Sequence, residues 1–376
     1  MTSEIFPLAI AAPEDCGMRS DQFDRLSALI ESHIAEGKHP GAQIAIARHG
    51  KLVYEQTFGY AGIGERARPA SSDTLWLLYS NTKVITAAAL WILAERGKFS
   101  FADRIADYLP EFAKNGKGNI TILQLLTHQC GFPNAVIDRA AWNDHALMRA
   151  QIAEFSLEWT PGSRYEYHAT AAHWVAAMVI NAISGTDYRT FIHDEIIQPL
   201  GLEKELFVGL PKAEMARAAD MHVVDTGHLA TDPISTADDF RMAGIPGGGG
   251  YGTARAMAAF YQALIHGGAL GERRILSPRM IAFATKDWTP GKHDVDGSAV
   301  HFGLGPYLRG DIEIANGLGG LGSPRTFGHG GAGSSVCWGD PDSGVSFAYV
   351  SNARQIEPWN MWRRDLVSNI VHAATL

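Results

Sequence analysis

Strand-like segments stand at both ends of this chain, and the long stretch between them has a helical pattern. Near the N-terminus, residues 42–47 and 52–58 are short apolar runs rich in β-branched residues, and the four residues between them predict a hairpin. Toward the C-terminus, short runs such as residues 336–338 and 345–351 alternate with glycine. This order predicts one α/β domain built from both ends of the chain, with a mainly helical domain inserted between them.

The helical pattern is clearest at two positions in the first hundred residues. Residues 21–36 carry apolar side chains at helical spacing and end before Gly37, and residues 83–96 form an apolar face that ends at Gly97. Further helices are predicted over residues 122–127, 146–155, 169–183, 188–197, 254–266 and 358–373, with few strands among those in the middle. We therefore assign residues 1–78 and 285–376 to the α/β domain and residues 79–284 to the helical domain.

Composition restricts the partners of the chain. Its 376 residues are 46% hydrophobic and 19% charged, which is typical of a compact globular protein. The net charge of -8 gives no electrostatic reason to bind nucleic acid or an anionic membrane. No apolar stretch reaches about 18 residues without a charge, so no membrane span is expected.

The N-terminus and the cysteines bear on the cellular compartment. Glu4 stands where a signal peptide carries positive charge, and two prolines interrupt the apolar run that follows. The cysteines, Cys16, Cys130 and Cys337, are scattered without CxxC spacing, which fits neither a disulfide framework nor a structural zinc site. We therefore expect three reduced thiols in a cytoplasmic protein.

One segment, Ser80-Asn81-Thr82-Lys83, has the spacing of an activated serine. Residues i and i+3 face the same side of a helix, which lets the Lys83 amine approach the Ser80 hydroxyl. A lysine kept neutral by desolvation can take the hydroxyl proton, and the start of the helix favours negative charge nearby. A serine that caps the helix beside a solvated lysine would give the same SxxK pattern, so the spacing alone does not decide.

Two further segments contain residues that could serve the same chemistry. Residues 161–169, PGSRYEYHA, form a turn that leads into a helix and include Tyr165 and Tyr167. Residues 328–333, GHGGAG, set His329 among glycines, where a substrate could lie along a strand edge without meeting a Cβ atom. By themselves, a loop tyrosine usually packs against its neighbours, and such a histidine is usually a loop residue.

Together with the SxxK segment, these residues resemble the serine β-lactamase and penicillin-binding protein superfamily, and most of all its class C β-lactamase and family VIII esterase branch. Residues 125–131 and 248–254 also look like connectors of that family. The resemblance implies a β-lactamase/transpeptidase-like fold, an antiparallel sheet flanked by helices, with the active site at the interface with the inserted helical domain. It implies that Tyr167, by its spacing from Pro-Gly, shares the general-base role with Lys83, with Tyr165 as the competing candidate.

The resemblance also assigns the substrate side of the site. It implies that His329, Gly330 and Gly331 border the substrate, and that the Ala332 N–H joins the Ser80 N–H in an oxyanion hole.

Two departures from the family pattern bear on the substrate. Where β-lactamases of this branch usually have asparagine two residues after the tyrosine, this chain has Ala169, so an amide that contacts the acylamino group of the substrate is missing. His329 stands where lysine is common, which removes a fixed charge that would attract a carboxylate. Uncharged acyl substrates are therefore expected.

Other catalytic motifs are absent or unspecific. The GxSxG elbow of α/β-hydrolases and the HExxH zinc motif do not occur in the sequence. Residues 247–252 and 317–322 both satisfy GxGxxG, but neither clearly links a strand to a helix, and glycine-rich turns explain them. Neither a cofactor nor a metal is expected.

The sequence thus predicts a serine hydrolase that forms an acyl-enzyme on Ser80, a carboxylesterase for small acyl esters. Within the superfamily the alternatives are a β-lactamase or D-peptide hydrolase, an amidase and an acyltransferase. The missing export signal argues against substrates outside the cytoplasm. A non-catalytic binding protein on the same scaffold is the alternative of another class. The expected partner is a small-molecule ester or amide, and the sequence does not define the oligomeric state.

Overall fold

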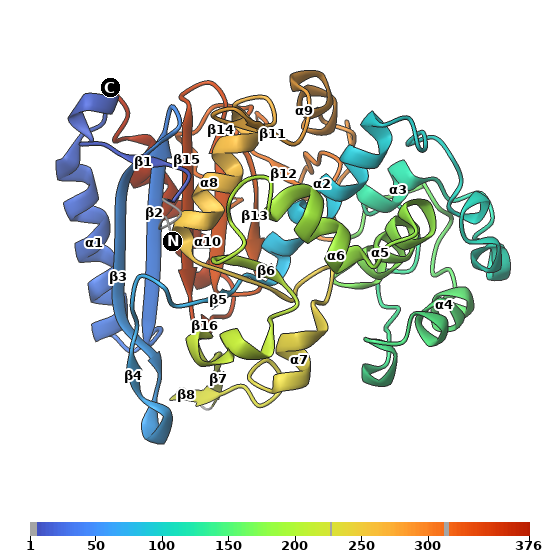
Figure 1. Cartoon of the computed structure of the whole chain (residues 1–376), viewed down its shortest axis with the longest axis horizontal. Coiled ribbons are helices and arrows are strands. Elements are labelled where there is room, and N and C mark those ends of the chain that lie inside the picture. Colours follow the sequence, from blue (N-terminus) through green and yellow to red (C-terminus); the bar gives the residue numbers. More distant parts are fainter. Residues whose placement is uncertain (1–5, 226–227, 312–315) are drawn as a thin grey trace, which may run out of the picture.

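The computed structural model describes residues 6–225, 228–311 and 316–376, and in this part of the chain strands from both ends form one eight-stranded sheet. Its order is β1-β3-β2-β15-β14-β13-β12, with β4 paired to β3 (Figure 1). The N-terminal strands are β1 (Ala9–Ile10), β2 (Gly41–Arg48), β3 (Lys51–Gly62) and β4 (Arg68–Pro69), and the C-terminal strands are β12 (Tyr307–Leu308), β13 (Phe327–Gly331), β14 (Ser335–Asp340) and β15 (Val345–Ser351). The antiparallel β2–β15 pairing joins the two ends, with Ile44 opposite Tyr349, and confirms the predicted fold class.

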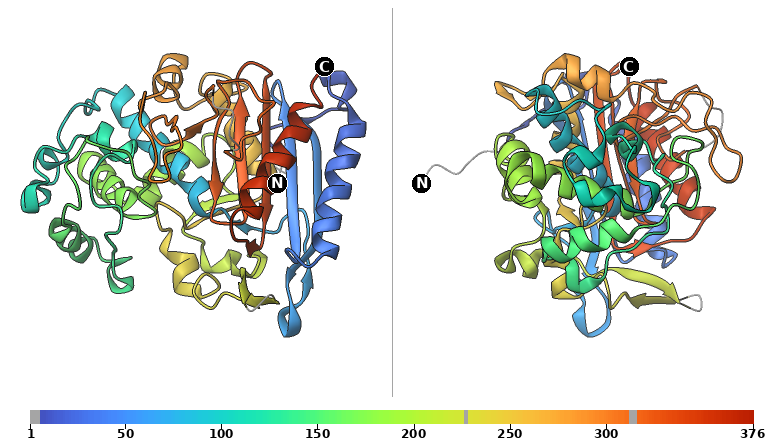
Figure 2. Two further views of the ribbon diagram at one scale, coloured as in Figure 1. Left: turned by 180° about the vertical axis from the view of Figure 1, so that it is seen from behind. Right: turned by 90° about the vertical axis from the view of Figure 1, so that its right-hand side faces the viewer.

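Apolar side chains of β2 point alternately to the two faces of the sheet, and helices cover both faces. Ile44 and Ile46 pack with α1 (Ser20–Ala35) and α10 (Trp359–His372), the first and last helices, which lie side by side on one face (Figures 1 and 2). Ala45 and Ala47 point to the other face, where α8 (Ala254–Ile265) packs against β2, β14 and β15. Successive side chains of a strand point to opposite faces, so a strand covered on both sides reads as a continuous apolar run.

Helices dominate the end of the molecule away from α1 (Figure 1). Helix α2 (Thr82–Glu95) is buried from Thr82 to Leu93 and packs against the equally apolar α5 (Ala171–Ser184). The others are α3 (Ile122–Leu126), α4 (His145–Glu154), α6 (Tyr188–Ile192), α7 (Asp238–Ala243) and α9 (Pro278–Ala284). The predicted helix over residues 188–197 consists of α6 and a π-helical turn, His193–Ile197. No helix in the described part of the chain combines the length and apolarity needed to cross a bilayer.

The middle of the chain also contains more strands than the sequence predicted. One small sheet consists of β5 (Trp76–Leu77), β9 (Gly250–Gly252) and β6 (Leu206–Val208), and a second of β16 (Ala353–Arg354), β7 (His222–Asp225) and β8 (His228–Thr231). The strands β10 (Ala269–Leu270) and β11 (Arg273–Arg274) form a separate pair. The predicted connector at residues 248–254 is a strand in part because β5 and β6, distant in sequence, pair with it from both sides. The domain division at residues 78 and 285 stays a prediction.

Candidate active site

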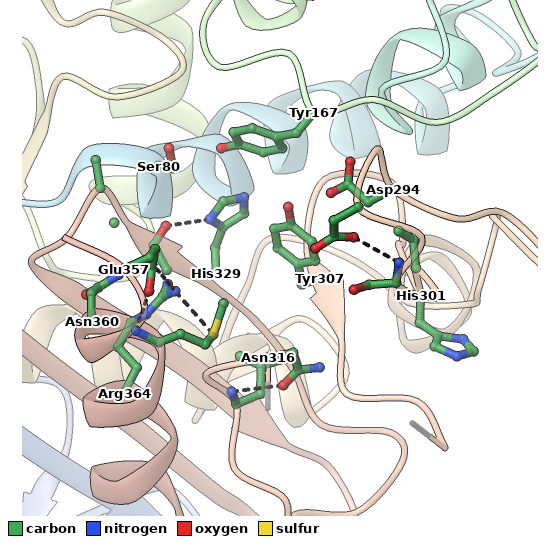
Figure 3. A pocket seen from close by; sticks show the side chains of 18 of the residues that line it. Ser80, Tyr167, Asp294, His301, Tyr307, Asn316, His329, Glu357, Asn360 and Arg364 are labelled. Carbon is green, nitrogen blue, oxygen red and sulfur yellow. Dashed lines mark hydrogen bonds and ion pairs between the residues drawn. The ribbon is translucent and has the colours of Figure 1, made fainter. Parts of the chain in front are cut away.

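A cavity of about 430 Å³ collects most of the residues that the sequence singled out. Ser80, Tyr167 and His329 line it (Figure 3), together with Gly330, Gly331 and Ala332. Lys83 does not line the cavity but lies behind Ser80, fully buried. The predicted site residues, which come from α2, the loop before α5 and the β13 edge, therefore lie together.

Ser80 belongs to a strained turn at the start of α2. The 3₁₀ turn Tyr79–Asn81 leads directly into the helix, and Tyr79 has a φ of 45°, in the left-handed region that non-glycine residues rarely adopt. Such a conformation costs on the order of 1–3 kcal/mol and persists where the surroundings enforce it. Here the Asn81 amide donates to Ser335 Oγ on β14 at 3.0 Å, and the Tyr79 hydroxyl pairs with Ser235 Oγ at 3.0 Å. Strain next to the serine is typical of a functional site.

The Lys83 amine is anchored by two main-chain carbonyls. Its Nζ atom lies 2.7 Å from the oxygens of Ala169 and Gly247 and 3.1 Å from Ser80 Oγ. Burial lowers the pKa of Lys83 from 10.5 to about 7. A neutral amine has two N–H groups and one lone pair, so the two carbonyls take both N–H groups and the lone pair is left for the Ser80 hydroxyl proton. This arrangement prepares Lys83 to act as a base toward Ser80.

Tyr167 occupies the cavity, and Tyr165 does not. The Tyr167 hydroxyl is buried without a hydrogen bond, and Lys83 Nζ lies 5.1 Å from the centroid of its ring. Burial, helped by Tyr307, raises the pKa of Tyr167 above its usual range, against smaller opposing effects of the Ser80 hydroxyl and Arg364. Tyr165 packs instead with Val300 and Phe302 and is not part of the cavity lining. Tyr167 is therefore a protonated phenol at neutral pH.

His128, in the connector at residues 125–131, holds the loop that carries Tyr167. Its φ of 56° turns the residue so that its carbonyl accepts from the Glu166 N–H at 3.3 Å and its Nδ1 accepts from the His168 N–H at 3.1 Å. Its ring lies 4.7 Å from the Tyr167 ring, centroid to centroid. His128 thus fixes the residues on both sides of the tyrosine. In sequence, this segment resembles only a connector of the family.

On the β13 edge, His329 is a neutral side chain. Burial, with the nearby Lys83 charge, lowers the pKa of His329 from 6.5 to about 3, and its Nδ1 lies 2.7 Å from the Gly330 oxygen. The edge packs tightly on the Ser80 turn, since a Cβ at Gly331 would lie 2.7 Å from the Leu78 oxygen. Ala332 is in the exposed turn that follows β13, and its oxyanion role stays a prediction.

The remaining wall of the cavity includes residues that sequence reasoning missed. Glu357, Asn360 and Arg364 come from α10 and the residue pair before it, and Tyr307 comes from β12 (Figure 3). For Asn360 and Arg364 the sequence showed only the helical pattern over residues 358–373. As for metals, no group of three or more histidine, cysteine, aspartate or glutamate side chains that could hold an ion occurs among the described residues.

Comparisons with known proteins agree on one family. The sequence model of the Beta-lactamase family matches residues 26–366. The chain is similar to the esterase/beta-lactamase LipL of Mycobacterium tuberculosis, at 28% identity over 83% of this chain and 77% of that protein. Among solved structures, a penicillin-binding protein homolog from Caulobacter crescentus superposes with a TM-score of 0.81 at 30% identity, covering 95% of this chain and 99% of that one. A family VIII carboxylesterase gives a TM-score of 0.81 at 28% identity, with the same coverage.

Proposed function

The chain belongs to the beta-lactamase family of serine hydrolases, and we propose that it is a carboxylesterase that cleaves small acyl esters through an acyl-enzyme on Ser80. The observation that carries the proposal is the environment of Lys83. Two main-chain carbonyls hold the amine, and the third oxygen within hydrogen-bond distance of Lys83 Nζ is Ser80 Oγ at 3.1 Å. A packing serine beside a solvated lysine would not require a buried amine.

In the proposed acylation step, Ser80 Oγ attacks the ester carbonyl carbon while its proton passes to the lone pair of Lys83 Nζ. The carbonyl oxygen becomes an oxyanion, which the N–H groups of Ser80 and Ala332 stabilise. As the C–O bond of the ester breaks, the Tyr167 hydroxyl gives its proton to the departing alkoxide, and the Lys83 ammonium reprotonates Tyr167. The alcohol leaves, and the acyl group stays on Ser80.

In the deacylation step, water attacks the acyl carbonyl and gives up a proton to the same neutral Lys83–Tyr167 pair. The Ser80 Oγ–acyl bond then breaks, Oγ takes the proton back, and the carboxylic acid leaves. A phenol that is protonated at neutral pH suits the donor part of this cycle, because a standing phenolate could not protonate the leaving group.

Esters are favoured over β-lactams by the residue at position 169. Ala169 lines the cavity, so no side-chain amide is present at the place where β-lactamases of this branch hold the acylamino group. The similarity to a family VIII carboxylesterase and to an esterase/beta-lactamase supports the same choice.

The proposal is tested by Ser80→Ala in hydrolysis of 4-nitrophenyl butyrate. We expect kcat to fall by roughly 10⁴- to 10⁶-fold, because the members of such a catalytic unit act together. Ser32→Ala, which removes an exposed hydroxyl from α1, is the matched control and should keep wild-type activity. Activity of Ser80→Ala near that of the wild type would overturn the proposal. If the wild type turns over nitrocefin with a higher kcat/KM than the ester, the β-lactamase alternative replaces it.

A further inference from the structure

Arg364 brings a guanidinium group to the catalytic cavity from the sheet side. It lies on α10 and lines the same cavity as Ser80 and Tyr167, which lie at the α2 side of the view in Figure 3. The residue is only 9% exposed. Its position in the cavity makes Arg364 a candidate contact for substrate.

Within the described part of the chain, the guanidinium of Arg364 has no oxygen acceptor within hydrogen-bond distance. Among the described residues, its contacts are Met361 Sδ at 3.4 Å and a Glu357 carboxylate oxygen at 3.7 Å, beyond hydrogen-bond distance, and its Nε has no partner. The adjacent Arg363 is different, since it donates to the Tyr349 hydroxyl at 3.0 Å and to a carbonyl and an amide oxygen. The Nε of Arg363 also has no partner, but its Nη atoms have oxygen acceptors, and among the described residues those of Arg364 have none within hydrogen-bond distance. A buried charge without acceptors is costly.

Gly330 provides the seat for this guanidinium. A Cβ atom at position 330 would lie 1.6 Å from Arg364 Nη1, so the arginine occupies the space of the missing side chain. Its charge therefore lies against β13, one residue from His329. The charge also reaches the reacting groups, because it contributes to the lowered pKa of His329 and opposes the rise in the pKa of Tyr167.

Acidic residues of the cavity do not cancel this charge. Glu357 is held by the N–H of Met361 and the side-chain amide of Asn360, and its side chain is 56% exposed. Asp294 and Asp296 are partly or fully exposed, so water and salt screen them more than they screen the buried arginine.

We propose that Arg364 binds a carboxylate of the substrate, so that the preferred substrates are small esters that carry a free carboxylate on their acyl or alcohol part. This inference rests on the proposed esterase function and narrows its substrate class. A carboxylate supplies the two oxygen acceptors that match a guanidinium in a bidentate pair. The expectation of uncharged substrates rested on the loss of lysine at position 329, and Arg364 restores a fixed charge from another element.

The kinetic test compares anionic and neutral esters of matched shape. Monoethyl adipate and ethyl hexanoate differ in a carboxylate on the acyl part, and 4-acetoxybenzoate and 4-tolyl acetate differ in one on the alcohol part. In Arg364→Gln, the ratio of kcat/KM for the anionic ester to that for its neutral counterpart should fall by about 10- to 100-fold in at least one pair. The pair that responds identifies the part of the ester that carries the carboxylate.

Three further variants separate binding from a general structural effect. Arg364→Lys keeps the charge and should recover part of the ratio. Arg325→Gln removes an exposed arginine paired with Asp342 and should leave the ratio unchanged. Glu357→Gln removes the neighbouring negative charge and should raise the ratio, which decides the matter if Arg364→Gln does not fold. An unchanged ratio in both Arg364→Gln and Glu357→Gln, or in Glu357→Gln where the arginine variant does not fold, overturns the inference.

A binding measurement distinguishes failure of this inference from failure of the esterase proposal. Calorimetric titration of Ser80→Ala with monoethyl adipate should show binding at least tenfold tighter than that of ethyl hexanoate, and Arg364→Gln in the same background should remove the difference. Equal binding of the two esters would refute the carboxylate site, even for a confirmed esterase. If instead Ser80→Ala hydrolyses esters like the wild type, the proposed catalytic serine is wrong, while the kcat/KM ratios of Arg364→Gln still decide the carboxylate site.

Discussion

Lowering the pH through 7 should switch off acylation by protonating Lys83. Burial lowers the pKa of this amine from 10.5 to about 7. At about 1.4 kcal/mol per pH unit, that difference disfavours the charged form by about 5 kcal/mol relative to an exposed lysine. A protonated amine would have no lone pair for the Ser80 proton. We therefore expect kcat/KM for 4-nitrophenyl butyrate to fall about tenfold per pH unit below 7 and to reach a plateau above about pH 8.

The titratable groups near Lys83 do not account for such a fall of kcat/KM below pH 7. Burial holds the pKa of His168 at about 4 and that of His329 at about 3, and it keeps the pKa values of His128 and His173 well below 6.5. All four shifts favour the neutral ring, so none of these histidines accounts for a midpoint near 7. An acidic limb with a midpoint near 4, or activity that keeps rising to pH 10, would refute the assignment of Lys83 as the neutral base.

The same amine makes a second measurement possible, on stability. Between pH 7 and 10.5 the unfolded chain holds a proton on Lys83 that the native state lacks, so the free energy of unfolding should rise with pH, by up to about 1.4 kcal/mol per unit. Lys83→Met removes this contribution. Urea unfolding of both proteins at pH 7, 8 and 9 should therefore give a steeper increase for the wild type, and parallel curves would contradict the reasoning.

Two further predictions concern the residues around the serine. Tyr167→Phe should lower kcat by about 10²- to 10⁴-fold, because it removes the proposed proton donor, while urea unfolding should change by less than about 1 kcal/mol, because the hydroxyl has no hydrogen bond to lose. Gly331→Ala should destabilise the fold by about 1–3 kcal/mol in the same assay, since its Cβ would lie 2.2 Å from Ser335 Oγ and 2.7 Å from the Leu78 oxygen. An unfolding free energy equal to that of the wild type would show that the β13 edge can move away from the Ser80 turn.

Much of the fold could be predicted because its signals are local. The helical period before Gly97 marked α2, and the paired apolar runs marked the β2–β3 hairpin, since both patterns depend on neighbours in sequence. The small sheet around β9 could not be predicted, because its partners β5 and β6 lie far away in the chain and pair with a glycine-rich segment. Arg364 was missed for a related reason. Its sequence neighbours predict a helix, and only the packing of α10 against Gly330 brings its charge into the cavity.

The site residues show where sequence information ends. The sequence reveals the side chains of Ser80, Lys83 and Tyr167, but the atoms that hold them in position belong mostly to the main chain. In the proposed neutral Lys83, the carbonyls of two other residues take the N–H groups and leave the lone pair for Ser80. Tyr167 is held by hydrogen bonds of His128 to the residues on either side of it. Every residue type carries the same carbonyl, so no letter in the sequence marks these contacts. A change of residue type at position 169 should thus preserve the proposed base, provided that the backbone keeps its path, whereas a Cβ at Gly247 would lie 3.3 Å from Lys83 Nζ.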